Sequence, residues 1–111
     1  MSQSNQQSLN ISSMQCPNVQ SILEQIIGIC SADANVMKVT LFGSRAKGNA
    51  MERSDIDIAL IGDDIDVEKL RDEVFQIDTL LKIDLVDFNN CKNDLLKSEV
   101  LKDGITLFSK I

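Results

Sequence analysis

The sequence predicts an α/β (α+β) fold in which a small mixed β-sheet of about four strands packs against helices that lie mainly on one of its faces. The chain has 111 residues, a length that suits one domain with a core of its own. Short β-rich runs alternate with segments whose apolar residues have helical spacing. We assign the predicted domain to residues 16–111.

Residues 1–15 are rich in Ser, Gln and Asn and lack apolar periodicity, which predicts a flexible polar tail outside the domain. This stretch has no positive charge and no apolar run, so it does not have the pattern of a signal peptide. The cysteines Cys16, Cys30 and Cys91 are widely spaced, a pattern typical of free thiols in a reducing compartment. No run approaches the roughly 20 apolar residues of a membrane span. We therefore expect a cytoplasmic protein.

The first predicted helix starts at Pro17, because proline is favoured at the first helical position, and ends near Cys30. Its apolar residues fall at helical spacing: Val19, Ile22, Leu23, Ile26 and Ile27. The run 36–42 (VMKVTLF) follows as a β-strand that stops at Gly43. The domain is therefore expected to open with a helix and a strand.

The following segment, residues 44–51, predicts a short helix that Gly48 and Asn49 break. Residues 55–61 (DIDIALI) have the two-residue alternation of a strand. Residues 62–64 (GDD) have the composition of a turn, so we expect the chain to reverse there.

A longer helix is predicted from Asp66, where Asp66 and Glu68 place negative charge at the helix N-terminus. Its apolar residues fit one helical face: Val67, Leu70, Val74, Ile77 and Leu81. Residues 83–88 (IDLVDF) form the next predicted strand. These elements bring the chain back to the sheet through a helical connection.

The last predicted helix has Asn90 in position to cap it and Gly104 in position to end it. It contains Leu95, Leu96 and Val100. Residues 105–108 (ITLF) form the final short strand. The sequence shows no internal repeat and no second domain.

The chain contains no His, Tyr or Trp, which excludes several chemistries. Without His there is no His-based general acid or base, no Ser–His or Cys–His nucleophile and no zinc site with His ligands. The 17 acidic and 11 basic residues give a formal net charge of −6, which argues against tracking a long nucleic acid by phosphate neutralisation. Carboxylates remain the obvious chemical resource.

Asp55 and Asp57 lie two residues apart on a predicted strand, so their side chains are expected on one face. Carboxylates this close repel each other unless a cation lies between them, and Mg²⁺ takes oxygen ligands from one or two carboxylates. Asp84 lies between aliphatic residues inside the next strand and can face the same site if the two strands pair. Asp87 is the alternative. Because the strand period puts Asp87 on the other face, we prefer Asp84 and interpret Asp87 as a strand-end or helix N-terminal charge.

Gly43 and Ser44 supply the expected phosphate site, because glycine after a strand allows close backbone approach and Ser44 opens a helix with free N–H groups. Arg45 is either a support for the phosphates or a solvated charge. Residues 38–53 carry a net charge of +3, from Lys38, Arg45, Lys47 and Arg53 against Glu52. Residues 55–78 carry a net charge of −7, from nine acids and two bases. A basic edge beside an acidic cluster suits an Mg²⁺–nucleotide.

These residues resemble a known family. GSRAKGNAMERSDIDIAL followed by KIDLVDF is similar to the minimal nucleotidyltransferases of the DNA polymerase β-like superfamily. That pattern is Gly-Ser, a gap of about ten residues, Asp-x-Asp and a third acid between hydrophobic residues, which is matched by Gly43, Ser44, Asp55, Asp57 and Asp84. The resemblance extends over about residues 20–110.

The resemblance implies transfer of a nucleoside monophosphate, usually AMP from ATP, onto a hydroxyl. Asp55 and Asp57 would bridge two Mg²⁺ ions, and Asp84 would bind the ion that activates the attacking hydroxyl. Gly43 and Ser44 would hold the β- and γ-phosphates, with Arg45 as support. In-line attack at the α-phosphorus would release pyrophosphate.

Minimal members of this family are often paired with a small helical HEPN-domain protein in toxin–antitoxin modules, which suggests an antitoxin that adenylylates its HEPN partner on Tyr. A binding-only antitoxin that masks its partner and a free-standing transferase acting on a small-molecule hydroxyl are the alternatives. The chain has no Tyr, so modification of its own Tyr is excluded. The sequence leaves open whether copies of the chain form a homo-oligomer.

Overall fold

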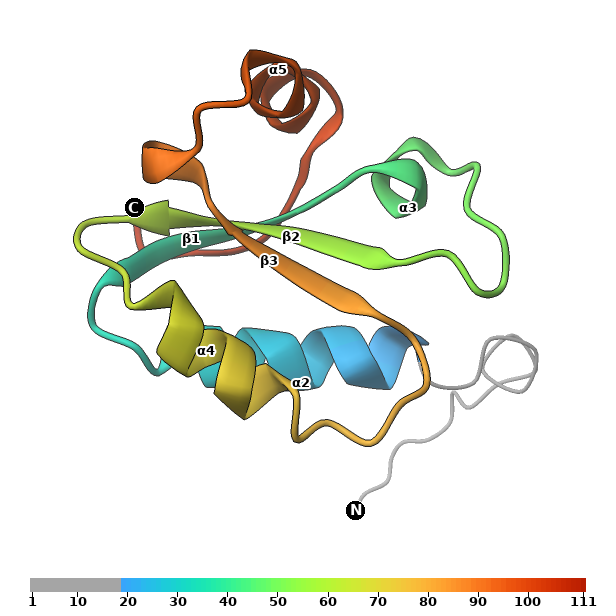
Figure 1. Cartoon of the computed structure of the whole chain (residues 1–111), viewed down its shortest axis with the longest axis horizontal. Coiled ribbons are helices and arrows are strands. Elements are labelled where there is room, and N and C mark those ends of the chain that lie inside the picture. Colours follow the sequence, from blue (N-terminus) through green and yellow to red (C-terminus); the bar gives the residue numbers. More distant parts are fainter. Residues whose placement is uncertain (1–18) are drawn as a thin grey trace.

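The computed structural model describes residues 19–111, so the predicted tail of residues 1–15, Cys16 and the helix start at Pro17 lie outside the described residues. The elements follow one another along the chain (Figure 1): α2 (Val19–Ser31), β1 (Val36–Phe42), α3 (Ser44–Lys47), β2 (Ile56–Gly62), α4 (Val67–Val74), β3 (Ile83–Asp87), the 3₁₀ helix η1 (Phe88–Asn90), α5 (Asp94–Asp103) and β4 (Ile105–Ser109).

The four strands form one mixed sheet in the order β3-β2-β1-β4. Strand β1 runs antiparallel to both β2 and β4, whereas β2 and β3 are parallel. Parallel neighbours need a crossover connection, which α4 provides between β2 and β3. The predicted α/β class and the mixed sheet are confirmed.

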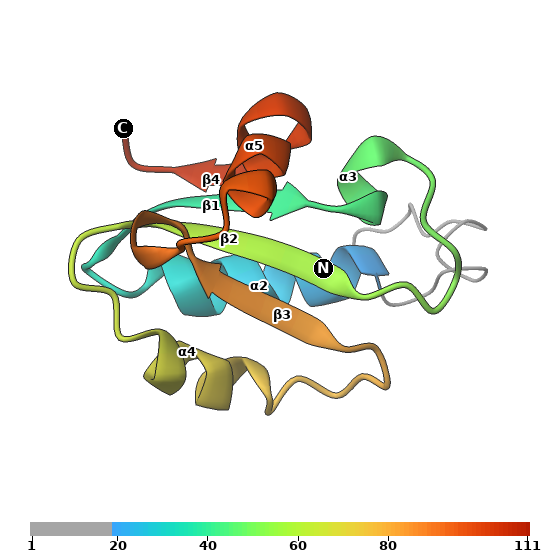
Figure 2. The ribbon, with the colours of Figure 1, turned by 45° about the horizontal axis from the view of Figure 1, so that its top comes forward.

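Helices lie on both sides of this sheet. Figures 1 and 2 show α2 and α4 on one face, and α5 with the short α3 toward the other. The larger core lies under α2 and α4, so most apolar burial is on one face, but the helices are not confined mainly to that face as expected. Helix α5 adds a smaller apolar layer opposite, formed by Phe42, Ala59 and Val100.

Alternation along β2 decides which side chains enter each layer. Ile56, Ile58 and Leu60 have no exposed surface and belong to the larger core, whereas Ala59 belongs to the smaller one. Cys30 of α2 is buried in the larger core, and this burial, with the nearby charges of Asp33 and Glu73, raises its thiol pKa from 9.0 to about 12. The α2 face of the sheet is therefore dry and closed.

The helix predicted from Asp66 is shorter than its apolar spacing suggested. Helix α4 ends at Val74, and Ile77 and Leu81 follow it in the connection to β3. The Ile77 N–H donates to the Val74 carbonyl at 3.0 Å, which tightens the last turn, and Thr79 Oγ1 then accepts from the Leu81 N–H at 3.0 Å. This local side-chain hydrogen bond competes with helical pairing. Ile77 is nevertheless buried.

The cap of α5 also differs from the prediction. Asn93, not Asn90, is the N-cap residue, and its Oδ1 accepts from the Leu96 N–H at 3.1 Å. Asn90 belongs instead to η1, where its amide donates to Asp87 Oδ2 at 2.7 Å. Gly104 ends α5 as expected, with its N–H donating to the Val100 carbonyl. The β3–α5 connection therefore contains an extra 3₁₀ turn.

Candidate active site

Two of the predicted carboxylates are neighbours across the parallel strands. Asp57 of β2 and Asp84 of β3 are register partners. The residues that follow them, Ile58 and Leu85, are buried in the larger core, so both carboxylates project from the opposite face, the one that α5 partly covers. The structure therefore brings Asp57 and Asp84 together.

Asp55 lies just outside the strand rather than on it. Strand β2 begins at Ile56, whose N–H donates to the Lys82 carbonyl at 2.9 Å, and Asp55 precedes this bond as an exposed residue. The prediction of a strand from residue 55 was therefore wrong by one residue. The physical reason is that pairing with β3 begins at Ile56, opposite Ile83.

Nearby acidic side chains shift the pKa of the Asp57 carboxyl. Its pKa is raised first by burial and then by the charges of Asp84, Asp55 and Glu99, while Lys82 acts in the opposite direction. The three predicted carboxylates thus interact electrostatically at Asp57. Glu99 acts on Asp57 from α5 and Lys82 from the residue directly before β3, and sequence reasoning missed both.

Gly43 leaves the space that the Asp57 carboxylate occupies. It has a φ of +76°, in the left-handed region, and is the N-cap residue of α3. A Cβ atom at this position would lie 2.4 Å from Asp57 Oδ2, closer than any real contact. Glycine is therefore required here both by the backbone and by the carboxylate beside it.

Arg45 and Lys47 of α3 already have partners within the protein. The Arg45 guanidinium donates to backbone carbonyls of residues 51–54, including two bonds to Ser54 O at 2.8 and 3.1 Å. Lys47 Nζ lies 3.7 Å from Glu99 Oε2 of α5, so a salt bridge joins α3 to α5 on the side of the sheet that carries Asp57 and Asp84. Glu99 partly neutralises the predicted basic edge at Lys47, whereas the charge of Arg45 faces neutral carbonyls.

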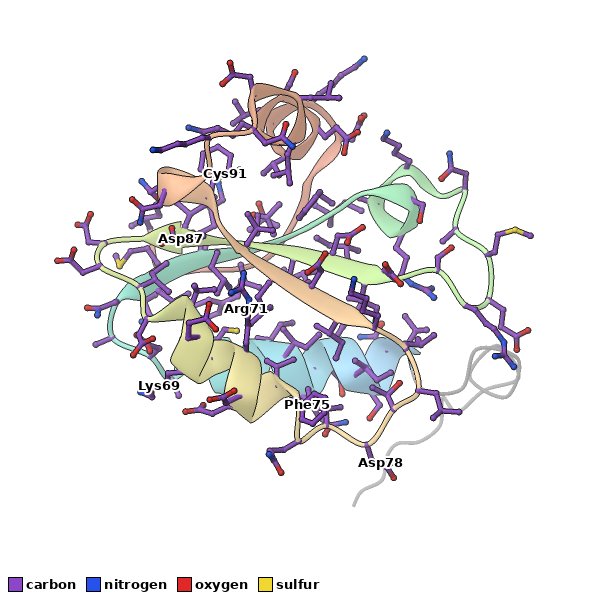
Figure 3. The ribbon with its side chains drawn as sticks, in the orientation of Figure 1. Lys69, Arg71, Phe75, Asp78, Asp87 and Cys91 are labelled. Carbon is purple, nitrogen blue, oxygen red and sulfur yellow. The ribbon has the colours of Figure 1, made fainter. Side chains whose placement is uncertain are left out.

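Asp87 has a local role at the end of β3. Its Oδ2 accepts from Asn90, and Figure 3 shows it near Cys91, at the start of the connection to α5. This agrees with its interpretation as a strand-end charge. Figure 3 also shows Arg71 between α4 and β3, where Nη2 donates to the Leu85 carbonyl at 2.9 Å, and Asp78 on the side of the molecule away from α5.

Whether this site can bind a metal ion depends on which oxygen ligands the protein supplies. Among residues 19–111, no group of three or more His, Cys, Asp or Glu side chains lies close enough together to hold a metal ion. The adjacent carboxylates of Asp57 and Asp84, beside the side-chain-free Gly43, still match the way Mg²⁺ binds, through one or two carboxylates with water and phosphate in the remaining positions. The residues present fit one such ion.

The family model for polymerase β nucleotidyltransferases matches residues 24–111. A search of curated proteins found no significant match. No helix in the part of the chain from residue 19 onward is long and apolar enough to cross a membrane.

Solved structures give three informative similarities. A chain of a toxin–antitoxin complex with AMP-PNP is 26% identical with a TM-score of 0.64, over 78% of this chain and 73% of that one. A Sulfolobus solfataricus protein described as a candidate nucleotidyltransferase is 18% identical with a TM-score of 0.58, over 95% and 94%. A complex of tri-AMPylated Shewanella oneidensis HEPN toxin with MNT antitoxin gives 23% identity and a TM-score of 0.56, over 81% and 71%. The last two similarities concern the fold alone.

Proposed function

Since the chain belongs to the polymerase β nucleotidyltransferase family, we propose that it transfers AMP from ATP onto a hydroxyl of a HEPN-type partner protein and acts as its antitoxin. The observation that carries the proposal is the pairing of Asp57 with Asp84 beside Gly43. The match to a toxin–antitoxin chain crystallised with AMP-PNP supports the nucleotide and the partner.

In this proposal the phosphates of ATP lie against Gly43 and Ser44, on the backbone that carries no Cβ next to Asp57. Asp57 and Asp84 would hold one Mg²⁺ ion, and Asp55 would join them when a second ion binds, because no three acidic groups of residues 19–111 lie close enough to hold a metal in this structure. When bound, these ions supply charge stabilisation at the attacking and leaving oxygens. The Asp84 carboxylate would accept a hydrogen bond from the acceptor hydroxyl and orient its oxygen toward the α-phosphorus.

The reaction is a substitution at phosphorus. The acceptor oxygen forms a bond to the α-phosphorus while the bond to the bridging oxygen of pyrophosphate breaks, and the hydroxyl proton leaves to solvent. No step requires an imidazole, which agrees with a chain that has no His. The partner must supply the acceptor, and because this chain has no Tyr, any AMP found on Tyr belongs to the partner.

The test is mass spectrometry of a HEPN-domain partner incubated with this chain, ATP and Mg²⁺. We expect the partner to gain the mass of one or more AMP groups. Asp57→Asn should reduce the rate by at least about 100-fold, because a preorganised electrostatic group is lost at the reacting centre. Asp63→Asn, which removes an exposed carboxylate from the turn after β2, is the matched control and should leave the rate unchanged.

Two outcomes would replace the proposal. Full suppression of the partner's toxicity by Asp57→Asn would favour a binding-only antitoxin. Transfer to small hydroxyl compounds but never to a protein would favour a free-standing transferase. A cytoplasmic location stays a prediction.

A further inference from the structure

The turn of residues 51–54 lies directly before Asp55, and Arg45 holds it from helix α3. Arg45 Nε and Nη2 both donate to the Ser54 carbonyl, at 3.1 and 2.8 Å, and Nη2 also donates to the Glu52 carbonyl at 3.1 Å. A longer bond of 3.4 Å reaches the Met51 carbonyl. The guanidinium is partly buried, and all of its hydrogen bonds described above go to the backbone of one turn.

The same turn is closed by its own hydrogen bonds. The Met51 N–H donates to Ser54 Oγ at 2.8 Å, and the Ser54 N–H donates to the Met51 carbonyl at 3.1 Å. Beyond the turn, the Ile56 N–H donates to the Lys82 carbonyl at 2.9 Å. Asp55 is therefore fixed on both sides, by Arg45 at Ser54 and by β3 at Ile56, although its own side chain is exposed.

We propose that Arg45 is a positioning residue, which holds the 51–54 turn and thereby keeps Asp55 in place at the start of the strand that carries Asp57. The proposal rests on the proposed function for its catalytic consequence. Hydrogen bonds to a charged donor contribute more to stability than hydrogen bonds between neutral groups. Loss of the guanidinium therefore frees the turn, whereas a phosphate-binding arginine would instead affect nucleotide affinity.

The first test measures amide hydrogen exchange and needs no enzymatic activity. Arg45→Met should accelerate exchange at the Ser54 N–H by roughly tenfold or more. Arg53→Met, which removes an exposed arginine from the same turn, is the matched control and should leave this exchange unchanged. The Leu60 amide, in the middle of β2, reports whether each variant is folded.

The second test separates positioning from phosphate binding. We expect Arg45→Met to lower kcat while the KM for ATP changes by less than about twofold. Added methylguanidinium should restore part of the activity of Arg45→Ala, because the shortened side chain leaves the position of the guanidinium empty. If Arg45→Met fails to fold, Arg45→Lys replaces it and should show the same changes at smaller size, because a lysine cannot bridge several carbonyls at once.

Unchanged exchange at Ser54 in a folded variant would overturn the proposal, as would a raised KM for ATP at constant kcat. If the wild-type chain transfers no AMP but its turn still depends on Arg45, the proposed function fails while the structural role of Arg45 stands. The two failures are therefore distinguishable.

Discussion

The two faces of the sheet differ in both polarity and closure. On the α2 and α4 face, the side chains of Ile56, Ile58 and Leu60 are completely buried. On the α5 face, the same strand places Asp57 next to Asp84, and the apolar cluster there is small. Successive residues of one strand thus enter a dry core and a half-covered, acidic surface.

This difference indicates that stability and function are divided between the faces. Apolar burial on the α2 face stabilises the fold. On the α5 face, the raised pKa of Asp57 reports burial and repulsion that oppose folding in the absence of a cation. Substitutions on the two faces should therefore have opposite consequences, and the three that follow are ordered by expected size.

The largest effect is expected on the closed face. Leu60→Ala should lower the free energy of unfolding by about 2–5 kcal/mol, because it leaves a cavity in a fully buried part of the core. Urea denaturation measures this loss. Ile61→Ala, one residue along and half-buried, is the matched control and should cost clearly less. A loss below about 1 kcal/mol for Leu60→Ala would show that the α2 face does not dominate stability.

The boundary between the faces is tested at Gly43. Gly43→Ala should cost about 1–3 kcal/mol for its backbone, whose φ of +76° and ψ of −157° lie in a region essentially restricted to glycine, plus the cost of moving the Asp57 carboxylate away from the new Cβ. Gly48→Ala is the comparison and should cost less, because Gly48 is in the milder αL conformation (φ +82°, ψ +13°) and no atom lies within 4 Å of an added Cβ. Equal losses of stability in the two variants would contradict the close approach of Gly43 to Asp57.

The smallest effect, and the only gain, is expected at Asp57. Asp57→Asn should raise the free energy of unfolding at pH 7 without Mg²⁺ by about 0.5 kcal/mol or less, since solvent screens this half-exposed carboxyl. A raised folded-state pKa means that the wild-type loses stability as the pH rises from about 3.9 through that pKa. The gain should therefore disappear near pH 3.

Urea titrations at both pH values measure this difference, with Asp63→Asn as the control for removing one exposed charge. A loss of stability in Asp57→Asn at pH 7 would show that the carboxylate is favourably bonded rather than repelled. The difference in the free energy of unfolding between the two pH values gives the energetic effect of holding the charged Asp57 beside Asp84.

Much of the fold follows from local patterns in the sequence. The run VMKVTLF predicts β1 with the observed bounds, because β-branched residues and a terminal glycine mark both its type and its end. The pairing of Asp57 with Asp84 is predictable from strand period once β2 and β3 are taken as neighbours. These features depend on residues close together in the chain.

What the sequence could not predict depends on contacts between distant segments. Glu99 reaches the acidic site only because α5 folds back over the sheet, and the bonds of Arg45 depend on the path of the 51–54 turn. The end of α4 at Val74 also contradicts its helical spacing, because Ile77 is buried from a turn instead. Apolar spacing therefore predicts which residues are buried more reliably than it predicts where a helix ends.

The parallel pairing of β2 and β3 has a consequence for how faithfully the chain folds. A shift of β3 by one residue against β2 would exchange the two faces of the strand. Asp84 would then enter the larger core and Leu85 would be exposed to water. Burying an unpaired carboxylate among aliphatic side chains is strongly unfavourable. Asp84 therefore penalises the misaligned sheet, and the residue proposed for chemistry also helps the chain to select its correct strand register.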